Sequence, residues 1–120
     1  MENTNEKIAI LLRMVGISPA LLGYKYIRAA TKLVLADPSF IDNITSRLYP
    51  HIAKEYGTTS SRVERAIRHG VETAFLNMPP DVKNAVFGNT ATGGKVTNSA
   101  FIATLADIIV NEPNNIIWKL

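Results

Sequence analysis

The residues with the clearest chemistry lie in "SRVERAIRH", residues 61–69, where three arginines and one histidine fall within eight positions. Guanidinium groups pair with the O6 and N7 atoms of guanine, and a carboxylate such as that of Glu64 accepts from cytosine N4. At about 100° of rotation per residue, Val63 and Ile67 fall on one face of a helix and the arginines on the exposed side. The spacing therefore predicts an amphipathic helix whose exposed face can contact nucleic acid.

Two interpretations of this helix compete. The plainer one is a solvated helix in which Glu64, Arg68 and Glu72 form ion pairs four residues apart. The stretch "LYPHIAKEYG" followed by "TTSS" favours DNA binding, because a short helix, a glycine-containing turn and a second capped helix make a helix-turn-helix. The threonine and serine caps also place backbone N–H groups and hydroxyls where phosphates would pass. We therefore predict a recognition helix over about residues 60–76 that contacts double-stranded DNA.

Helical periodicity continues along almost the whole chain, so the predicted fold class is all-α, a single compact domain of about six helices over residues 1–120. Asn3 and Glu6 resemble a capping box that opens the first helix, and Gly16 ends it. Gly23 is expected to divide the next stretch into a short turn and a longer helix that closes before Pro38. We predict a short helix over 39–46 and a helix over 46–56, whose start moves to near Tyr49 if Pro50 lies in its first turn. A further helix is predicted from Pro80 to Gly88, and a final helix is expected to be capped by Asn98 or Ser99.

Composition narrows the function classes. The 120 residues contain no cysteine, which excludes disulfides and thiolate metal sites, and their net charge is only +3. The longest apolar runs, such as "IAILL", fall far short of the ~20 residues that span a bilayer, and the N-terminus lacks the pattern of a signal peptide. These features predict a cytoplasmic protein without a membrane partner.

Other reactive side chains form no recognisable catalytic or ligand-binding constellation. The two histidines, His51 and His69, have no cysteine or carboxylate at metal-ligand spacing. The run "NTATGGKVTNS" lacks the G-x-x-x-x-G-K-[ST] spacing and the preceding strand of a phosphate-binding loop, so we predict a flexible connection. Helix capping accounts for Asp37, Asp42 and Asp81. We predict no catalytic residues, no metal site and no cofactor, and therefore no enzymatic activity.

A longer stretch resembles a known family. The residues from "LYPHIAKEYG" to "HGVETAF", with "GYKYIRAA" before them and "KVTNSAFIATLAD" after them, resemble the DNA-binding effector domain of the stage zero sporulation protein A family. The resemblance covers about residues 7–110 and leaves 111–120 as a divergent tail. It implies about six helices, with the recognition helix in the major groove of a TGTCGAA-like element. It also implies tandem binding to paired elements, and activation or repression of transcription according to promoter position.

The same resemblance implies which residues contact DNA. The family's contact positions hold matching residue types here, namely Ser61, Arg62, Glu64, Arg65, Arg68, His69 and, in the loop before the last helix, Lys95. The chain departs from the family at Glu55, where a lysine is usual, and at Gly70, which replaces an alanine at a cost of up to ~1 kcal/mol in helix propensity. The phosphorylatable receiver domain of the family has no counterpart in these residues. A stand-alone chain of this kind would bind DNA without being switched by its own phosphorylation.

Besides binding to double-stranded DNA, we consider two hypotheses in which the partner is a protein. A helical interaction module would act on a full-length regulator or on RNA polymerase, and its apolar interface would resist salt, whereas phosphate-anchored binding weakens steeply as salt rises. A homodimer on tandem sites would pair through the last helix and the tail. The candidate residues are Phe101, Ile102, Leu105, Ile108, Ile109, Ile116, Ile117 and Trp118, for which burial in the core of one copy is the plainer interpretation, as it is for Tyr24, Tyr26, Phe75 and Phe87.

Overall fold

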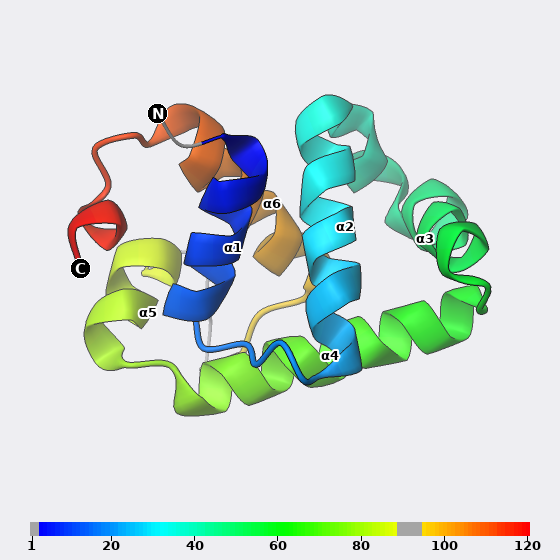
Figure 1. The fold of residues 1–120 in the computed structure, drawn as a ribbon, viewed down its shortest axis with the longest axis horizontal. Helices are drawn as coiled ribbons and strands as arrows, with labels where there is room; N and C mark the ends of the chain where they lie inside the picture. Colours follow the sequence, from blue (N-terminus) through cyan, green and yellow to red (C-terminus); the bar gives the residue numbers. More distant parts are fainter. Residues whose placement is uncertain (1–2, 89–94) are drawn as a thin grey trace.

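The computed structural model describes residues 3–88 and 95–120, and within these ranges the chain is built from helices (Figure 1). The α-helices of the described residues are α1 (Thr4–Met14), α2 (Leu22–Ala36), α3 (Tyr49–Tyr56), α4 (Ser60–Asn77), α5 (Pro80–Phe87) and α6 (Asn98–Asn111). Three short segments complete them: the 3-10 helix η1 (Pro38–Asn43), the π-helix η2 (Ile44–Leu48) and the 3-10 helix η3 (Ile116–Lys119). The all-α prediction is confirmed. The radius of gyration, 13.3 Å, is that of one compact domain of this size.

Local signals fix several helix ends where the sequence predicts them. The side chain of Asn3 accepts a hydrogen bond of 2.8 Å from the N–H of Glu6 at the start of α1. Gly16 and Gly57, which follow α1 and α3, have φ angles of 86° and 64°. Glycine adopts this left-handed conformation without the steric cost that a Cβ atom would bring.

Two segments differ from their predicted form. Residues 39–46, expected to be a short helix, fold as 3-10 and π turns that lead directly into α3. Helix α3 begins at Tyr49, the later of its two predicted starts, because the proline that follows lacks an N–H group and fits only in a first turn. The cap of α6 is Thr97, whose hydroxyl accepts from the N–H of Ala100 at 3.0 Å, so the prediction of Asn98 or Ser99 is wrong.

Helix α2 lies in the middle of the molecule and crosses α4 at close range (Figure 1). Residues 19–20 form a turn and α2 runs from Leu22 to Ala36, so the predicted division into a short turn and a longer helix is confirmed, with Gly23 itself inside the first turn of α2. A Cβ atom at Gly23 would overlap the carbonyl oxygen of Ala66 in α4, and one at Gly70 would lie 3.2 Å from the Cδ1 atom of Ile27. The two glycines therefore let the α2 and α4 backbones approach each other.

An aromatic cluster joins α4, α5 and α6 in the core. The ring centroid of Phe87 lies 5.0 Å from that of Phe75 and 5.0 Å from that of Phe101, and all three side chains are buried. Tyr26 is buried in α2, while Tyr24 is half-buried beside the core. The core interpretation is thus confirmed for these aromatic residues, with Tyr24 at its edge.

The C-terminal tail packs against α5. Ile117 in η3 is 2% exposed, and the indole N–H of Trp118 donates to the carbonyl of Glu112 at 2.9 Å. The amide of Asn115 donates to a carbonyl of α5 at 3.2 Å. Ile116, in contrast, is exposed. The core interpretation is also confirmed for all the candidate pairing residues of α6, which are Phe101, Ile102, Leu105, Ile108 and Ile109.

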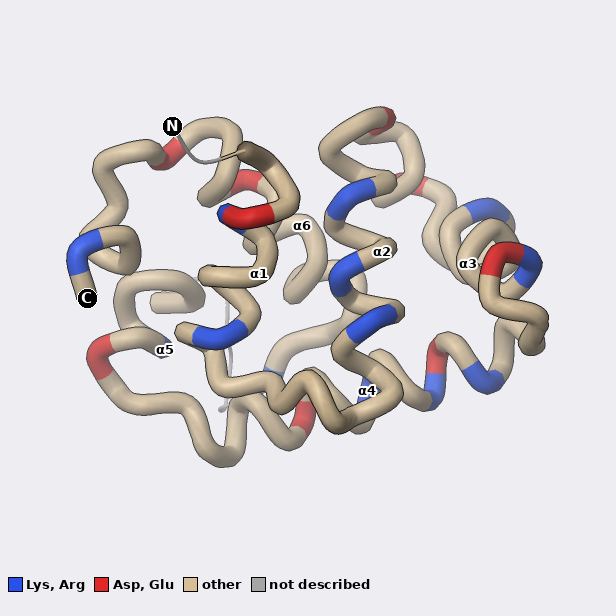
Figure 2. Tube along the Cα trace, in the orientation of Figure 1, with Lys and Arg blue, Asp and Glu red and all other residues tan. Residues whose placement is uncertain are grey.

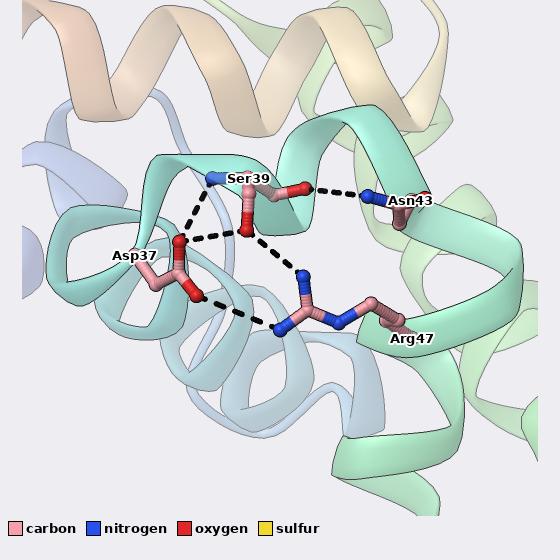
Figure 3. A network of polar contacts seen from close by, with 4 residues as sticks. All are labelled: Asp37, Ser39, Asn43 and Arg47. Atoms are coloured by element: carbon pink, nitrogen blue, oxygen red, sulfur yellow. Dashed lines mark hydrogen bonds and ion pairs between the residues drawn. The ribbon is translucent and has the colours of Figure 1, made fainter.

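Asp37 organises the connection between α2 and α3 (Figure 3). Its carboxylate accepts hydrogen bonds from the N–H (3.1 Å) and the hydroxyl (2.7 Å) of Ser39 and pairs with the Arg47 guanidinium at 3.5 Å. Arg47 also donates to the Ser39 hydroxyl (2.8 Å), and the amide of Asn43 donates to the Ser39 carbonyl (3.0 Å). The bonds from Ser39, helped by Arg47, favour the charged carboxylate and lower the pKa of Asp37. The predicted capping role of Asp37 is confirmed, whereas Asp42 lies inside η1 and not at a cap.

Candidate nucleic-acid interface

Helices α3 and α4 form the predicted helix-turn-helix. The turn ends α3 with a Schellman motif, in which Gly57 is left-handed and the N–H of Thr58 donates to the carbonyl of Ala53 at 2.9 Å. The hydroxyl of Thr59 accepts from the N–H of Arg62 at 3.2 Å and caps α4. Helix α4 agrees with the predicted recognition helix to within one residue at its end.

The outer face of α4 carries the predicted contact residues. Val63 and Ile67 are buried against the rest of the domain, as the periodicity predicts. The predicted residues of this helix are exposed except for Glu64, which is half-buried; they are Ser61, Arg62, Glu64, Arg65, Arg68 and His69. The amphipathic arrangement is confirmed, and contact of these residues with DNA stays a prediction.

The three arginines of α4 differ in their electrostatic surroundings. Arg68 lies between two carboxylates, with its guanidinium nitrogens 3.3 Å from Glu64 and 3.9 Å from Glu72, so both predicted ion pairs are present. Among residues 3–88 and 95–120, Arg62 and Arg65 have no ion-pair partner. Their charges are therefore available to an anion. The N-terminal half of α4 is the part of this helix best suited to bind phosphates or base edges.

Asn98 ties the two helices of the motif to α6. Its amide nitrogen lies 3.0 Å from the hydroxyl of Tyr49 in α3, 3.3 Å from the carbonyl of Glu64 in α4 and 3.5 Å from that residue's carboxylate. Burial raises the pKa of Tyr49, although the bond from Asn98 acts in the opposite direction. This role is not evident from the sequence, because the position of Asn98 beside a helix start indicates a cap.

Lys95 lies beside α4. With Glu64 and Arg68 it lines a groove of about 950 Å³ between α4 and the start of α6. The two unpaired arginines lie outside this groove, nearer to the start of α4. Residues 89–94, which hold most of the predicted flexible connection, lie outside the described residues.

The histidines lie apart from any cluster of metal ligands in the described part of the chain, where no three His, Cys, Asp or Glu residues come close enough to share an ion. His51 instead packs edge-on against Phe40, with ring centroids 5.6 Å apart. His69 is exposed on α4. None of the helices over 3–88 and 95–120 has both the length and the apolar character needed to cross a bilayer.

The chain matches a known protein family. The family described as "Sporulation initiation factor Spo0A C terminal" matches residues 8–109. The match runs from α1 to α6, includes all seven predicted contact residues and agrees with the span over which the sequence resembles this family. The family is one of DNA-binding regulatory domains and not of enzymes. Because the match spans most of the 120 residues, the chain belongs to the Spo0A C-terminal family of DNA-binding effector domains.

Proposed function

We propose that this chain is a transcription regulator that binds double-stranded DNA sequence-specifically, with α4 in the major groove of a TGTCGAA-like element. The observation that carries the proposal is the pair Arg62 and Arg65, exposed on α4 and without ion-pair partners among the described residues. In helix-turn-helix proteins the N-terminal residues of the second helix approach base edges. Membership in a family of DNA-binding effector domains supports the same function.

The position and chemistry of each residue support a distinct role. Arg65, at the centre of the exposed face, is assigned to the O6 and N7 atoms of a guanine. Ser61 and Arg62 belong to the first turn of α4, where backbone N–H groups also favour anions, and are assigned to phosphates. Lys95 is assigned to phosphate as well, because it approaches from outside the recognition helix.

Arg68 and its neighbours contribute differently. The ion pairs of Arg68 with Glu64 and Glu72 offset part of its attraction for DNA and must shift before it donates to a base or a phosphate. Glu64, placed by Asn98, has the chemistry to accept from cytosine N4. His69 extends the polar face beyond these residues. On DNA, we propose RNA polymerase and a second copy on an adjacent element as protein partners.

Titration of the chain against a duplex that contains a TGTCGAA-like element, and against a scrambled duplex of the same length, tests the proposal. We expect at least about fivefold tighter binding to the element, since one bidentate arginine–guanine pair contributes about 1–3 kcal/mol of discrimination. Binding to both duplexes should weaken steeply as salt rises. Equal affinities for the two duplexes, or binding that resists salt, would contradict base reading and favour a protein-interaction module.

A further inference from the structure

A second cationic surface lies between α2 and α3. Figure 2 shows lysine and arginine positions spaced along α2 and others in η2 and α3. Four such side chains, Lys25, Arg28 and Lys32 of α2 and Lys54 of α3, line a groove of about 890 Å³, which we call the α2–α3 basic groove. All four are exposed. The roles proposed for α4 and Lys95 use none of them.

The charge of this groove is not balanced by nearby carboxylates. Helix α2 contains three cationic residues and no Asp or Glu. Among the residues that line the groove, Glu55 contributes a carboxylate and His51 an imidazole. In the described part of the chain, none of the four cations forms an ion pair. Like charges at this spacing repel one another, and a bound polyanion would remove that repulsion.

The cations form an ordered stripe that begins next to the recognition helix. The three cations of α2 follow one another at intervals of three and four residues, so they share one face over about 10 Å. The ammonium of Lys25 lies 5.6 Å from the ring centroid of Tyr26 and 5.2 Å from that of Tyr56. Tyr56 is the last residue of α3, directly before the turn into α4. The packing of Gly23 on Ala66 fixes the same end of α2 against α4.

We propose that the α2–α3 basic groove binds the phosphate backbone of DNA that flanks the element contacted by α4; this inference rests on the function proposed above. In helix-turn-helix proteins the first helix of the motif crosses the DNA backbone, and here that helix supplies Lys54 to the groove. The stripe on α2 then extends the phosphate contacts beyond the motif. Its role is affinity without sequence preference, because phosphate contacts carry no base information.

The composition of the groove favours DNA over an acidic protein. Three of its four cations are lysines, whose flexible ammonium groups meet phosphates without the geometric demands of a guanidinium fork. Protein interfaces depend on large apolar or aromatic anchors at their centre. Of the residues lining this groove, only Tyr56 is a large hydrophobic side chain exposed to solvent, and its ring already holds Lys25.

The test compares two double variants with matched charge loss. Arg28→Gln/Lys32→Gln removes two cations from the groove, and Arg13→Gln/Lys119→Gln removes two exposed cations outside it. Binding is measured over a series of salt concentrations on duplexes with the element or a scrambled sequence, each with about one helical turn of flanking DNA. We expect the slope of log K against log salt to become shallower by about 1.8 in the groove variant on both duplexes, and to change little in the control. The preference for the element should stay unchanged.

Three results would overturn the inference. Equal slopes for the two double variants would show that the groove does not bind phosphates, and would leave its cations for an acidic protein. A difference that persists on a duplex trimmed close to the element would place the contacts inside the element. A charge-keeping variant, Arg28→Lys/Lys32→Arg, should retain the wild-type slope, and a shallower slope there would contradict a charge-based role. If the wild type shows no preference for the element, base recognition by α4 is refuted. The salt slopes of the two double variants would still test whether the groove binds phosphates.

Discussion

The exposed face of α4 and the α2–α3 basic groove are both rich in cations, yet they are built differently. Helix α4 carries three arginines and two glutamates, whereas α2 carries two lysines, one arginine and no carboxylate. A planar guanidinium fork beside a carboxylate can distinguish one base edge from another. Unbalanced ammonium groups attract any phosphate. The greater excess of positive charge therefore does not lie on the helix best suited to recognise sequence.

The same contrast appears within α4. Arg62 and Arg65 have no carboxylate partners in the described structure, while Arg68 is held by two. We infer that the first half of the helix supplies most of its attraction for DNA. Glu64, which lies between Arg62 and Arg65 in the sequence, adds discrimination, because its carboxylate disfavours bases that present only acceptors.

We expect the largest effect from disturbing the contact between α2 and α4, because it places the two surfaces relative to each other. Gly23→Ala puts a Cβ atom against the backbone carbonyl of Ala66, and we expect the free energy of unfolding to fall by about 1–3 kcal/mol or more. Urea denaturation measures this change. Gly70→Ala is the control, because its Cβ would meet the flexible end of the Ile27 side chain at 3.2 Å and backbone atoms of Gly23 no closer than 3.8 Å, and the helix gains up to ~1 kcal/mol in propensity. Equal losses in both variants would refute a close backbone crossing at Gly23.

A substitution at Asn98 disturbs the α4 surface and leaves the α2–α3 basic groove intact. Asn98→Ala removes hydrogen bonds to Tyr49 and Glu64, and we expect a loss of about 1–2 kcal/mol in the free energy of unfolding. Binding to the element should also weaken, because Glu64 loses a partner that positions it. Asn111→Ala serves as the control, since that amide contacts only the exposed Asp107. Similar stability of the two variants would show that the Asn98 bonds contribute little.

Lys95 sharpens the distinction between phosphate and base contacts. Lys95→Ala should weaken binding to the element and to scrambled DNA alike and make the salt slope shallower by about 0.9. Fluorescence anisotropy at several salt concentrations provides the measurement. A loss confined to the element would mean that Lys95 contacts bases.

We expect the smallest effect on stability from the Asp37 network, which lies in the connection that leads into α3, one wall of the α2–α3 basic groove. Because hydrogen bonds lower the pKa of Asp37, its contribution to stability is fully present above the usual value of 3.8 and is lost as the pH falls through the lowered pKa. The difference in Tm between wild type and Asp37→Asn should therefore be constant near neutral pH and narrow in acid. Asp42→Asn, outside the network of Figure 3, is the control. A difference that is unchanged in acid would contradict the role of the charged carboxylate.

Features encoded by neighbouring residues were predictable from the sequence. The ends of α1, α3 and α4 follow from a side-chain cap at Asn3, left-handed glycines at Gly16 and Gly57, and a threonine–serine cap. The exposed face of α4 follows from its 3.6-residue period. The contact residues themselves come from resemblance to a family, and only their exposure and grouping are visible in the structure.

Features that depend on distant parts of the chain were not predictable. Gly23 indicates a break near the start of α2, but no neighbouring residue indicates that its absent side chain makes room for α4. Asn98 has the appearance of a cap, but its amide bonds to residues 34 and 49 positions away. The sequence does not show that the lysines of α2 belong to a cationic groove, because Lys54 of α3 joins them only in the folded structure.

Base recognition by α4 is tested most directly by measuring how strongly Arg65→Ala prefers one base pair over another at each position of the element. Arg65 is exposed and has no ion-pair partner in the described structure, so its removal should abolish about 1–3 kcal/mol of discrimination at one base pair of the element. Affinities of wild type and variant are compared across duplexes substituted one position at a time, with Arg13→Ala as the control for lost charge. We predict that Arg65→Ala loses its preference at one G·C pair and that Arg13→Ala keeps the full wild-type pattern. An Arg65→Ala protein that retains the wild-type preference at every position would contradict the assignment of α4 as the base-reading helix.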